Sequence, residues 1–565
     1  MIKFRVMGIL SALSYNKTRL VFSLLLLSAY VYFYDNGLKA REVMEHDSLL
    51  VVDSIQSEES MVHLLNADEI RYSKRLNPDA QMLVGNVAFR HDSMYMHCDS
   101  ALFFQDKNSF SAYFNIRIEQ GDTLFLFGDS LYYDGGTRLI RVRDNVRMEN
   151  KEMVLLTDSL NYDRNKNIGY FFNGGTLLDA DNTLTSEYGQ YNTTIKVATF
   201  TNSVTLESPD YTLTSDTLIY NTDYDLTYIV SPTKIVSGDY TVNSSSGLFN
   251  TATRQSVLLN RSVVSQKEGL RSIVGDSLFY NNAKGYGECF GDVIINDFEN
   301  NGMITGEYVY FDEQRDSAVV TGNALAVDFS QPDSFFLHAD TFRIVSHFDG
   351  NDSLLYRNIR AFNRARAFRT DIQLVADSIE FDSRDSCLTL YHDPIVWSGN
   401  QQILGEVIKV YMNDSALSWI HVINQALFVQ KLDSVHYNQI AGREMMAYFN
   451  NGEFDRAYVN GNVLVVYYPE DEDSVMIGMN TTEASHLTAY FKNKEISKIL
   501  ITERSNGVLY PMEELPTAKM YLLDFGWFDR IRPFSRWDIF YWRGKSQEEK
   551  IKTRSSRNIP LPTLN

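Results

Sequence analysis

Apolar and polar residues alternate along most of this chain, with a period of two rather than the 3.6 residues of a helix. Residues 212–220, with the sequence TLTSDTLIY, show the pattern. Residues two apart in a strand point to the same face. The alternation therefore predicts strands that are apolar on one face and polar on the other.

A seven-residue phrase returns about every thirty residues from Ala67 onward. It consists of a small residue, Asp, Ser or Thr, Leu, an often aromatic residue, Tyr, and Asp or Asn. Clear copies begin at Gly128, Thr157, Ser215 and Gly275. A second phrase lies between the copies, in which a Gly, Asn or Asp turn precedes a β-branched residue, as in Asn145-Val146. Together the phrases predict strand, turn, strand and turn in each unit.

One such unit cannot bury its own apolar face, but stacked units share a continuous core. The expected fold class is therefore all-β, an elongated open β-jellyroll or solenoid of about 14 repeats of roughly 30 residues. The repeats are regular over residues 67–328 and less regular over residues 329–510, where an Arg-rich segment, 357–369, interrupts them. That segment is expected to be a strand whose Arg side chains pair with acidic neighbours. Binding of anionic headgroups is the alternative.

The ends of the chain differ from the repeats. Residues 1–35 carry Lys and Arg ahead of a mostly apolar run, 20–34, and predict a hydrophobic helix that is either a signal peptide or a membrane anchor. The positive-inside rule then places the repeats outside the cytoplasm. A linker is expected over residues 36–66.

Residues 511–565 are expected to form an aromatic-rich segment followed by a disordered tail. The segment is predicted either to dock on a partner or membrane or to cap the last repeat. The candidate docking residues are Trp527, Phe528, Trp537 and Trp542.

Composition narrows the possible functions. The net charge of −20 argues against a nucleic-acid partner, because phosphate binding needs clustered Lys and Arg, and it disfavours contact with an anionic membrane. The ten histidines do not cluster with Asp or Glu at ligand spacing, so no metal site and no cofactor is predicted. Cys98, Cys289 and Cys387 are expected to be small core residues, although a disulfide between two of them stays open.

Gly128–Leu131 and Gly275–Leu278 spell the Gly-Asp-Ser-Leu block of a family of serine hydrolases. A catalytic nucleophile is needed once, whereas this block recurs with no accompanying repeated base. The repeated Asp-Ser is therefore predicted to be a structural turn or ladder element. Ser130 and Ser277 are not expected to be catalytic, and the protein is predicted not to be an enzyme.

The alternation of Ala/Gly-Asp-x-Leu-x-Tyr-Asp with Gly-Asn-Val over about residues 67–463 resembles the repeat of the OstA-like family, which includes LptA-type proteins of lipopolysaccharide transport. The resemblance implies two facing antiparallel sheets, open along one edge, whose apolar interior holds the acyl chains of lipopolysaccharide. It also implies a periplasmic bridge that carries this lipid from the inner to the outer membrane for outer-membrane assembly. The implied partners are lipopolysaccharide, an inner-membrane Lpt export complex, an outer-membrane LptD-type translocon, and further copies of the chain joined head to tail.

In such a groove, the Leu and Tyr of the first phrase would form one wall, and the apolar residues after the turn would form the other. The residues expected to line it are Leu131, Tyr133, Val146, Leu160, Tyr162, Val204, Leu218, Tyr220, Val263, Leu278, Tyr280, Val293 and Ile295. Two other interpretations stay open. One is a structural envelope scaffold with a closed, close-packed core. The other is a β-helix enzyme acting on glycans, which would carry paired carboxylates on one ridge.

Overall fold

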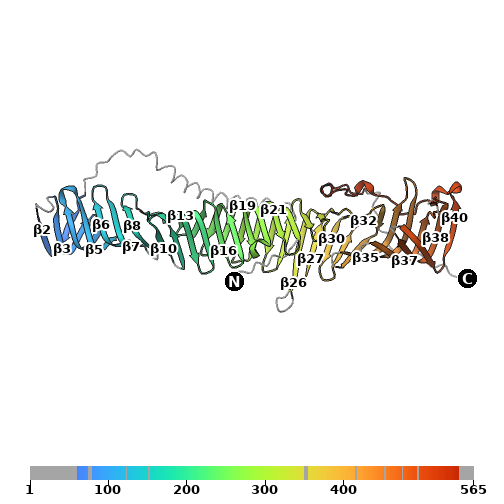
Figure 1. Cartoon of the computed structure of the whole chain (residues 1–565), viewed down its shortest axis with the longest axis horizontal. Coiled ribbons are helices and arrows are strands. Elements are labelled where there is room, and N and C mark those ends of the chain that lie inside the picture. The colour runs from blue at the N-terminus through green and yellow to red at the C-terminus, as the bar shows by residue number, and fades with distance from the viewer. Residues whose placement is uncertain are drawn as a thin grey trace. The chain divides into compact units, whose positions relative to one another are not determined.

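The computed structural model describes residues 60–545, apart from 74–78, 123, 151–152, 180, 349–353, 414–415, 451–452, 472, 474 and 493–494. The described residues fall into two compact units, an N-terminal and a C-terminal unit, which divide between Asp225 and Leu226. Nearly all of them lie in antiparallel strands, as the alternation predicts (Figure 1). The segment 1–35, with its expected helix, and most of the expected linker 36–66 lie outside the described residues. No helix in the described part of the chain is long and apolar enough to cross a membrane.

The N-terminal unit is an antiparallel meander, and its first strand falls at the end of the segment expected to be a linker. Some strands are interrupted, so that β9 and β10 are two halves that both pair with β8. The strands are β1 (His63–Asn66), β2 (Glu69–Tyr72), β3 (Gln81–His91), β4 (Met94–Phe104), β5 (Ser109–Gln120), β6 (Leu124–Asp134), β7 (Leu139–Asn150), β8 (Met153–Asp163), β9 (Ile168–Phe171), β10 (Gly175–Asp179), β11 (Asn182–Ser186), β12 (Tyr188–Asn192), β13 (Val197–Ser208) and β14 (Tyr211–Asn221).

The C-terminal unit continues the same pattern and ends in a segment of short 3-10 turns. Its strands are β15 (Leu226–Ile229), β16 (Thr233–Ser237), β17 (Tyr240–Ser244), β18 (Ser246–Asn250), β19 (Gln255–Gln266), β20 (Arg271–Asn281), β21 (Tyr286–Asp297), β22 (Gly302–Asp312), β23 (Ser317–Thr321), β24 (Leu325–Asp328), β25 (Phe335–His338), β26 (Thr341–Phe348), β27 (Leu354–Phe362), β28 (Ala365–Phe368), β29 (Gln373–Ala376), β30 (Ser378–Asp382), β31 (Cys387–Tyr391), β32 (Ile395–Ser398), β33 (Gln401–Leu404), β34 (Val407–Asn413), β35 (Ala416–Lys431), β36 (Tyr437–Asn450), β37 (Glu453–Tyr467), β38 (Gly478–Lys492), β39 (Glu495–Thr502) and β40 (Asn506–Pro511). The turns are η2 (Gln105–Lys107) in the first unit, and η3 (Lys267–Gly269), η4 (Met512–Glu514), η5 (Thr517–Lys519), η6 (Asp529–Ile531) and η7 (Asp538–Phe540) in the second.

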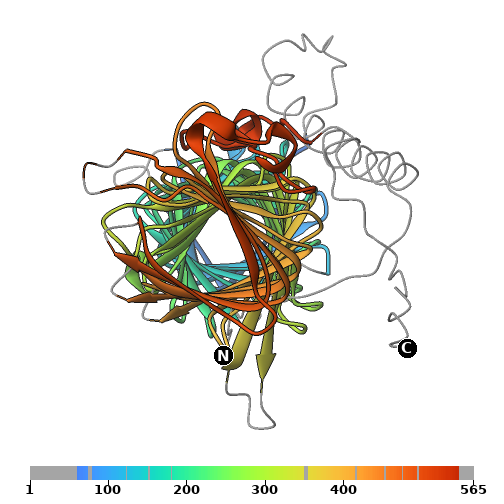
Figure 2. The ribbon, with the colours of Figure 1, turned by 90° about the vertical axis from the view of Figure 1, so that its right-hand side faces the viewer.

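Each long strand bends in its middle and therefore belongs to two sheets. At the bend of β5, Phe114 and Asn115 have φ angles of 64° and 48°, and the pairing with β6 shifts there. The halves on the two sides of the bends form sheets that face each other across the interior, which the end-on view displays (Figure 2). The first sheet is the one that contains Leu126 of β6, and the second sheet contains Tyr133 of the same strand.

The bends correct the expectation for the second phrase, which was predicted to be a turn between two strands. It lies instead at a bend within one strand, since Asp144 and Asn145 of β7 have φ angles of 65° and 51°. The Asp of the first phrase lies at the bend and accepts a hydrogen bond from the Asn of the second phrase, with Nδ2 of Asn145 2.5 Å from Oδ2 of Asp129. The same contact joins Asn86 to Asp68 and Asn115 to Asp99. A small residue precedes the Asp because a Cβ on Gly128 would lie 2.3 Å from Cγ1 of Val142.

The last Asp or Asn of the first phrase starts the hairpin that follows. Oδ1 of Asp134 accepts hydrogen bonds from the backbone N–H of Gly136 (3.0 Å) and of Thr137 (3.2 Å). Equivalent turns begin at Asp163, Asn192, Asn221 and Asn250. The recurring Asp and Asn residues are therefore structural, as predicted, and the Gly-Asp-Ser-Leu blocks at Ser130 and Ser277 belong to this bend.

The Arg-rich segment 357–369 forms the end of β27 and β28. Arg360 on β27 pairs with Glu380 on β30 at 3.0 Å, and Arg369 pairs with Asp371 at 2.6 Å. These contacts match the expected pairing of Arg side chains with acidic neighbours.

Candidate functional site

An apolar row runs along the inner face of the first sheet, with one residue from each strand. In the N-terminal unit its members are directly paired across neighbouring strands, and each is at most 4% exposed. They are Phe89, Met96, Ile118, Leu126, Met148, Leu155, Leu177, Leu184, Leu206 and Leu213. In this unit the interior is therefore close-packed, with a small cavity between Leu126, Met148 and Tyr162.

The second sheet supplies the facing wall, and most of the residues predicted to line the groove lie on the inner faces of the two sheets. Leu131 pairs with Val142 and then Leu160, while Tyr133 pairs with Ile140 and then Tyr162. The remaining Leu and Tyr of the first phrase also lie on this wall, namely Leu218, Tyr220, Leu278 and Tyr280. Val146, Val204 and Val293 lie directly after the bends, each at most 1% exposed.

Val263 does not occupy the position predicted for it. The bend of β19 consists of Asn260 and Arg261, so that Ser262 takes the buried site that Val204 takes in β13. Adjacent strand residues point to opposite faces. Val263 therefore points outward, and Val264 is the inward residue.

The same apolar row is open to solvent in part of the C-terminal unit. Its next members are partly exposed, whereas Ile235 before them and Leu337 after them are 7% and 9% exposed. We call these six partly exposed residues the accessible wall, and they are Val242, Val264, Ile273, Ile295, Ile304 and Ala326. Among the groove residues predicted from the sequence, Ile295 alone belongs to this wall.

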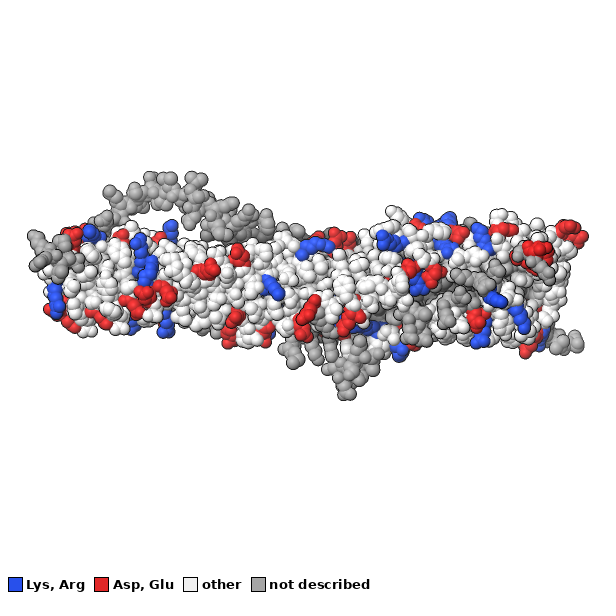
Figure 3. All heavy atoms as spheres, viewed as in Figure 1, with Lys and Arg blue, Asp and Glu red and all other residues white. Residues whose placement is uncertain are grey.

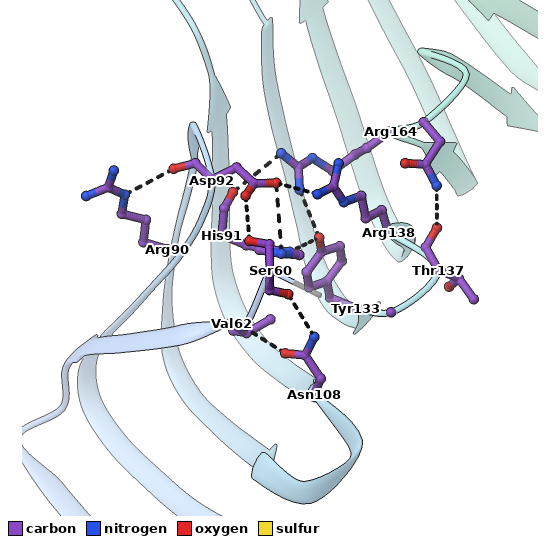
Figure 4. A network of polar contacts seen from close by, with 12 residues as sticks. Ser60, Val62, Arg90, His91, Asp92, Asn108, Tyr133, Thr137, Arg138 and Arg164 are labelled. Carbon is purple, nitrogen blue, oxygen red and sulfur yellow. Dashed lines mark hydrogen bonds and ion pairs between the residues drawn. The ribbon is translucent and has the colours of Figure 1, made fainter. Parts of the chain in front are cut away.

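Several tyrosines lie at the edge opposite the bends, where strands of both sheets end. In the N-terminal unit, the Tyr133 hydroxyl is 2.5 Å from Nδ1 of His91, across the interior, and accepts a hydrogen bond from Arg164 at 2.9 Å (Figure 4). Tyr220 donates to Asp179 at 2.6 Å, and Tyr191 accepts from Asn150 at 3.3 Å. These contacts join the two sheets at the edge and form a tyrosine clasp.

Burial lowers the pKa of His91, so its imidazole is neutral at neutral pH and Nδ1 can accept a hydrogen bond from the Tyr133 hydroxyl. In the C-terminal unit, the hydroxyl of Tyr280, on the sheet that faces the accessible wall, donates to Glu313 at 3.0 Å. Glu313 lies in the hairpin directly after β22, on the same side as Tyr280, so this contact does not cross between the sheets. Burial raises the pKa of Glu313 to about 7.

Replacing Tyr133 with Phe is expected to lower the free energy of unfolding by about 1–3 kcal/mol, because His91, which is fully buried, loses its partner. Chemical denaturation of the purified protein measures the change. Tyr132→Phe is the matched control, since Tyr132 is the neighbouring residue and is 37% exposed. Equal midpoints for Tyr133→Phe and the parent protein would mean that the clasp adds no net stability.

The C-terminal segment 512–545, here named the strap, covers the outer face of the first sheet in β29, β32, β33, β35 and β36. Trp527 and Phe528 pack against a buried cluster that includes Trp397 and Val429. They thus make contacts within the chain, on a sheet face and not at the last repeat's edge. Of the other residues predicted to dock a partner, Trp537 is 64% and Trp542 is 41% exposed.

Three buried glutamines hold the strap. Gln402 donates to the carbonyl of Gly526 at 2.7 Å and accepts from the N–H of Phe528 at 2.9 Å. Gln439 likewise donates a hydrogen bond to the carbonyl of Met520 and accepts one from the N–H of Leu522. Gln373 accepts a hydrogen bond from Arg532. Because side-chain amides replace the missing strand partners, the strap is fixed without joining the sheet.

The described residues offer no group of three or more His, Cys, Asp or Glu that could hold a metal ion. Cys98, Cys289 and Cys387 are buried and free, which agrees with their expected role in the core. Burial raises the pKa of Cys98 and Cys289 to about 12, so neither forms a thiolate at neutral pH.

Comparison with known proteins gives one family and a distant structural neighbour. Residues 59–216 and 212–272 match the model of the family described as OstA-like protein. No curated protein matches this chain. Among solved structures, the chain is similar to LptH from Pseudomonas aeruginosa, described as the LptA-homologous periplasmic component of the lipopolysaccharide transport device. The identity is 14%, the similarity covers 21% of this chain and 80% of LptH, and the TM-score is 0.18.

Proposed function

We propose that this chain, whose residues 59–272 match the OstA-like family, is a non-enzymatic, periplasmic lipopolysaccharide carrier. The observation that carries the proposal is the accessible wall, an unbroken row of apolar side chains that solvent reaches inside the fold. Acyl chains laid along it would gain about 0.8 kcal/mol for each buried CH2 group. Since neighbouring positions along the wall are chemically alike, an acyl chain could pass from one position to the next with little change in binding free energy.

In this proposal the carrier serves outer-membrane assembly by moving lipid from the inner to the outer membrane. An inner-membrane Lpt export complex would load it, an LptD-type translocon would receive the lipid, and copies of the chain could join head to tail. The apolar segment 20–34 would export the protein or anchor it to the inner membrane. Among the described strands, β1 and β2 of the N-terminal unit pair with β3 alone, and β39 and β40 of the C-terminal unit pair with β38 alone. These edge strands support end-to-end contact between copies.

The test is photo-crosslinking in cells with a probe at Ile273 on the accessible wall. Ser277 is the matched control position, because it lies on the same strand, is also partly exposed and points outward. Lipopolysaccharide adducts from Ile273 and none from Ser277 are expected. Absence of adducts from Ile273 in a folded protein would rule out this groove.

A scaffold is the second candidate, because the close-packed interior and tyrosine clasp of the N-terminal unit are what a purely structural β-solenoid needs. A probe at Leu160 separates the two functions within that unit, since Leu160 is fully buried. Adducts from Leu160 as well as Ile273 would mean that the clasp opens to lipid. Adducts from Ile273 alone would restrict lipid to the accessible wall.

A further inference from the structure

The end of the strap, residues 530–545, presents large aromatic side chains to solvent. Phe534, Trp537 and Tyr541 are 62%, 64% and 67% exposed. Trp, Tyr and Phe have an apolar body that favours the boundary between lipid headgroups and acyl chains. Four such residues, with Trp542, lie within nine positions of the sequence.

These side chains are held outward by a fixed loop. Ile539 is fully buried beneath it, and the ring of Phe540 packs against that of His338 on β25, with centroids 4.7 Å apart and the planes tilted by 50°. Asp538 accepts a hydrogen bond from the N–H of Phe534 at 3.0 Å and forms an ion pair with Arg543. The exposed aromatic side chains therefore cannot turn into the core, because Ile539 and Phe540 already occupy the space between the loop and the sheet.

Cationic side chains accompany the aromatic ones. The guanidinium of Arg536, an exposed residue, lies 4.8 Å from the ring centroid of Trp537, while the buried Arg366 lies beneath the loop, 5.3 Å from the ring centroid of Trp542. Lys and Arg side chains stand along the upper edge of the C-terminal unit, where the strap runs (Figure 3). In sequence, residues 530–557 contain nine Lys or Arg and three Asp or Glu, in a chain whose net charge is −20.

We propose that the loop Phe534–Trp542 is a membrane dock that inserts its aromatic side chains into the interface of an anionic phospholipid bilayer. Charge complementarity favours this occupant, because each Lys or Arg near an anionic surface contributes about 1 kcal/mol and Arg530 and Arg536 of the strap are exposed, while salt screens acidic residues that lie more than about 10 Å away. The dock lies on the outer face of the fold and does not depend on lipid transport through the interior.

An environment-sensitive dye on a single introduced cysteine tests the dock in the full chain. Tyr541→Cys provides the position, and selective labelling is possible because the three native cysteines are buried. Tyr224→Cys is the matched control, since Tyr224 is 72% exposed and lies in the other unit. A local dye reports insertion of this loop even if the segment 20–34 also binds vesicles.

With vesicles of phosphatidylglycerol and phosphatidylcholine, the dye at 541 is expected to shift to the blue and brighten, while the dye at 224 stays unchanged. Adding Trp537→Ala and Arg536→Glu to the labelled protein is expected to raise the lipid concentration for half-maximal response by roughly tenfold or more. No response at 541, or an equal response to phosphatidylcholine alone, would overturn the proposal. Shielding of the dye by an envelope-protein extract but not by vesicles would also overturn it, in favour of a protein partner.

Discussion

Replacing Ile273 and Ile295 together with Asp is expected to lower lipopolysaccharide affinity by about a hundredfold. The two residues are neighbours on the accessible wall, where β20 pairs with β21. A carboxylate in contact with acyl chains must lose part of its hydration, and about 3 kcal/mol lost in this way corresponds to about a hundredfold in affinity. Titration with fluorescent lipopolysaccharide measures the change.

The double variant is expected to fold, because both side chains are partly exposed and water can hydrate the new carboxylates when no lipid is bound. Ser277→Asp is the control, since it adds the same charge to the outer side of the same strand. Circular dichroism checks the fold of each variant. Unchanged affinity in a folded double variant would show that lipid does not contact this wall.

Replacing Gln402 with Leu is expected to release the strap and to lower the free energy of unfolding of the C-terminal unit by about 3–5 kcal/mol. The side-chain amide of Gln402 is fully buried. It forms hydrogen bonds with the backbone of Gly526 and Phe528, and it accepts a hydrogen bond from Nε1 of Trp397 at 2.9 Å. Without it, several buried donors and acceptors lose their partner, and each such loss costs about 1–3 kcal/mol.

Limited trypsin digestion measures strap release through the rate of cleavage after Arg530, and we expect that rate to rise at least tenfold. Ser398→Ala on the adjacent strand is the control, because Ser398 is exposed and its removal should leave the rate unchanged. If Gln402→Leu is digested no faster than Ser398→Ala, the glutamine does not hold the strap. Thermal unfolding followed in parallel separates local release from loss of the whole unit.

Much of the repeat could be predicted from residues close together in sequence. The seven-residue phrase places Leu131 and Tyr133 on one face because side chains alternate, whatever lies across the interior. The same reasoning failed at Val263, because a bend inserts two residues of positive φ and the degenerate sequence Asn-Arg-Ser-Val conceals which residue follows it.

The sequence alone determined that the chain is a stack of strands with one apolar and one polar face, since the period of two and the Asp and Asn residues of the repeated phrases act within one or two neighbouring strands. The bend in the middle of each long strand came only from the structure, because its Gly, Asn or Asp residues are also those of a hairpin turn. Only the tertiary structure decided where the interior is closed and where it is open. The bond from Tyr133 to His91 joins residues 42 positions apart, and Gln402 meets Phe528 across 126. Such contacts depend on the distance between sheets and on how a remote segment folds back, and neither leaves a periodic signal in the sequence.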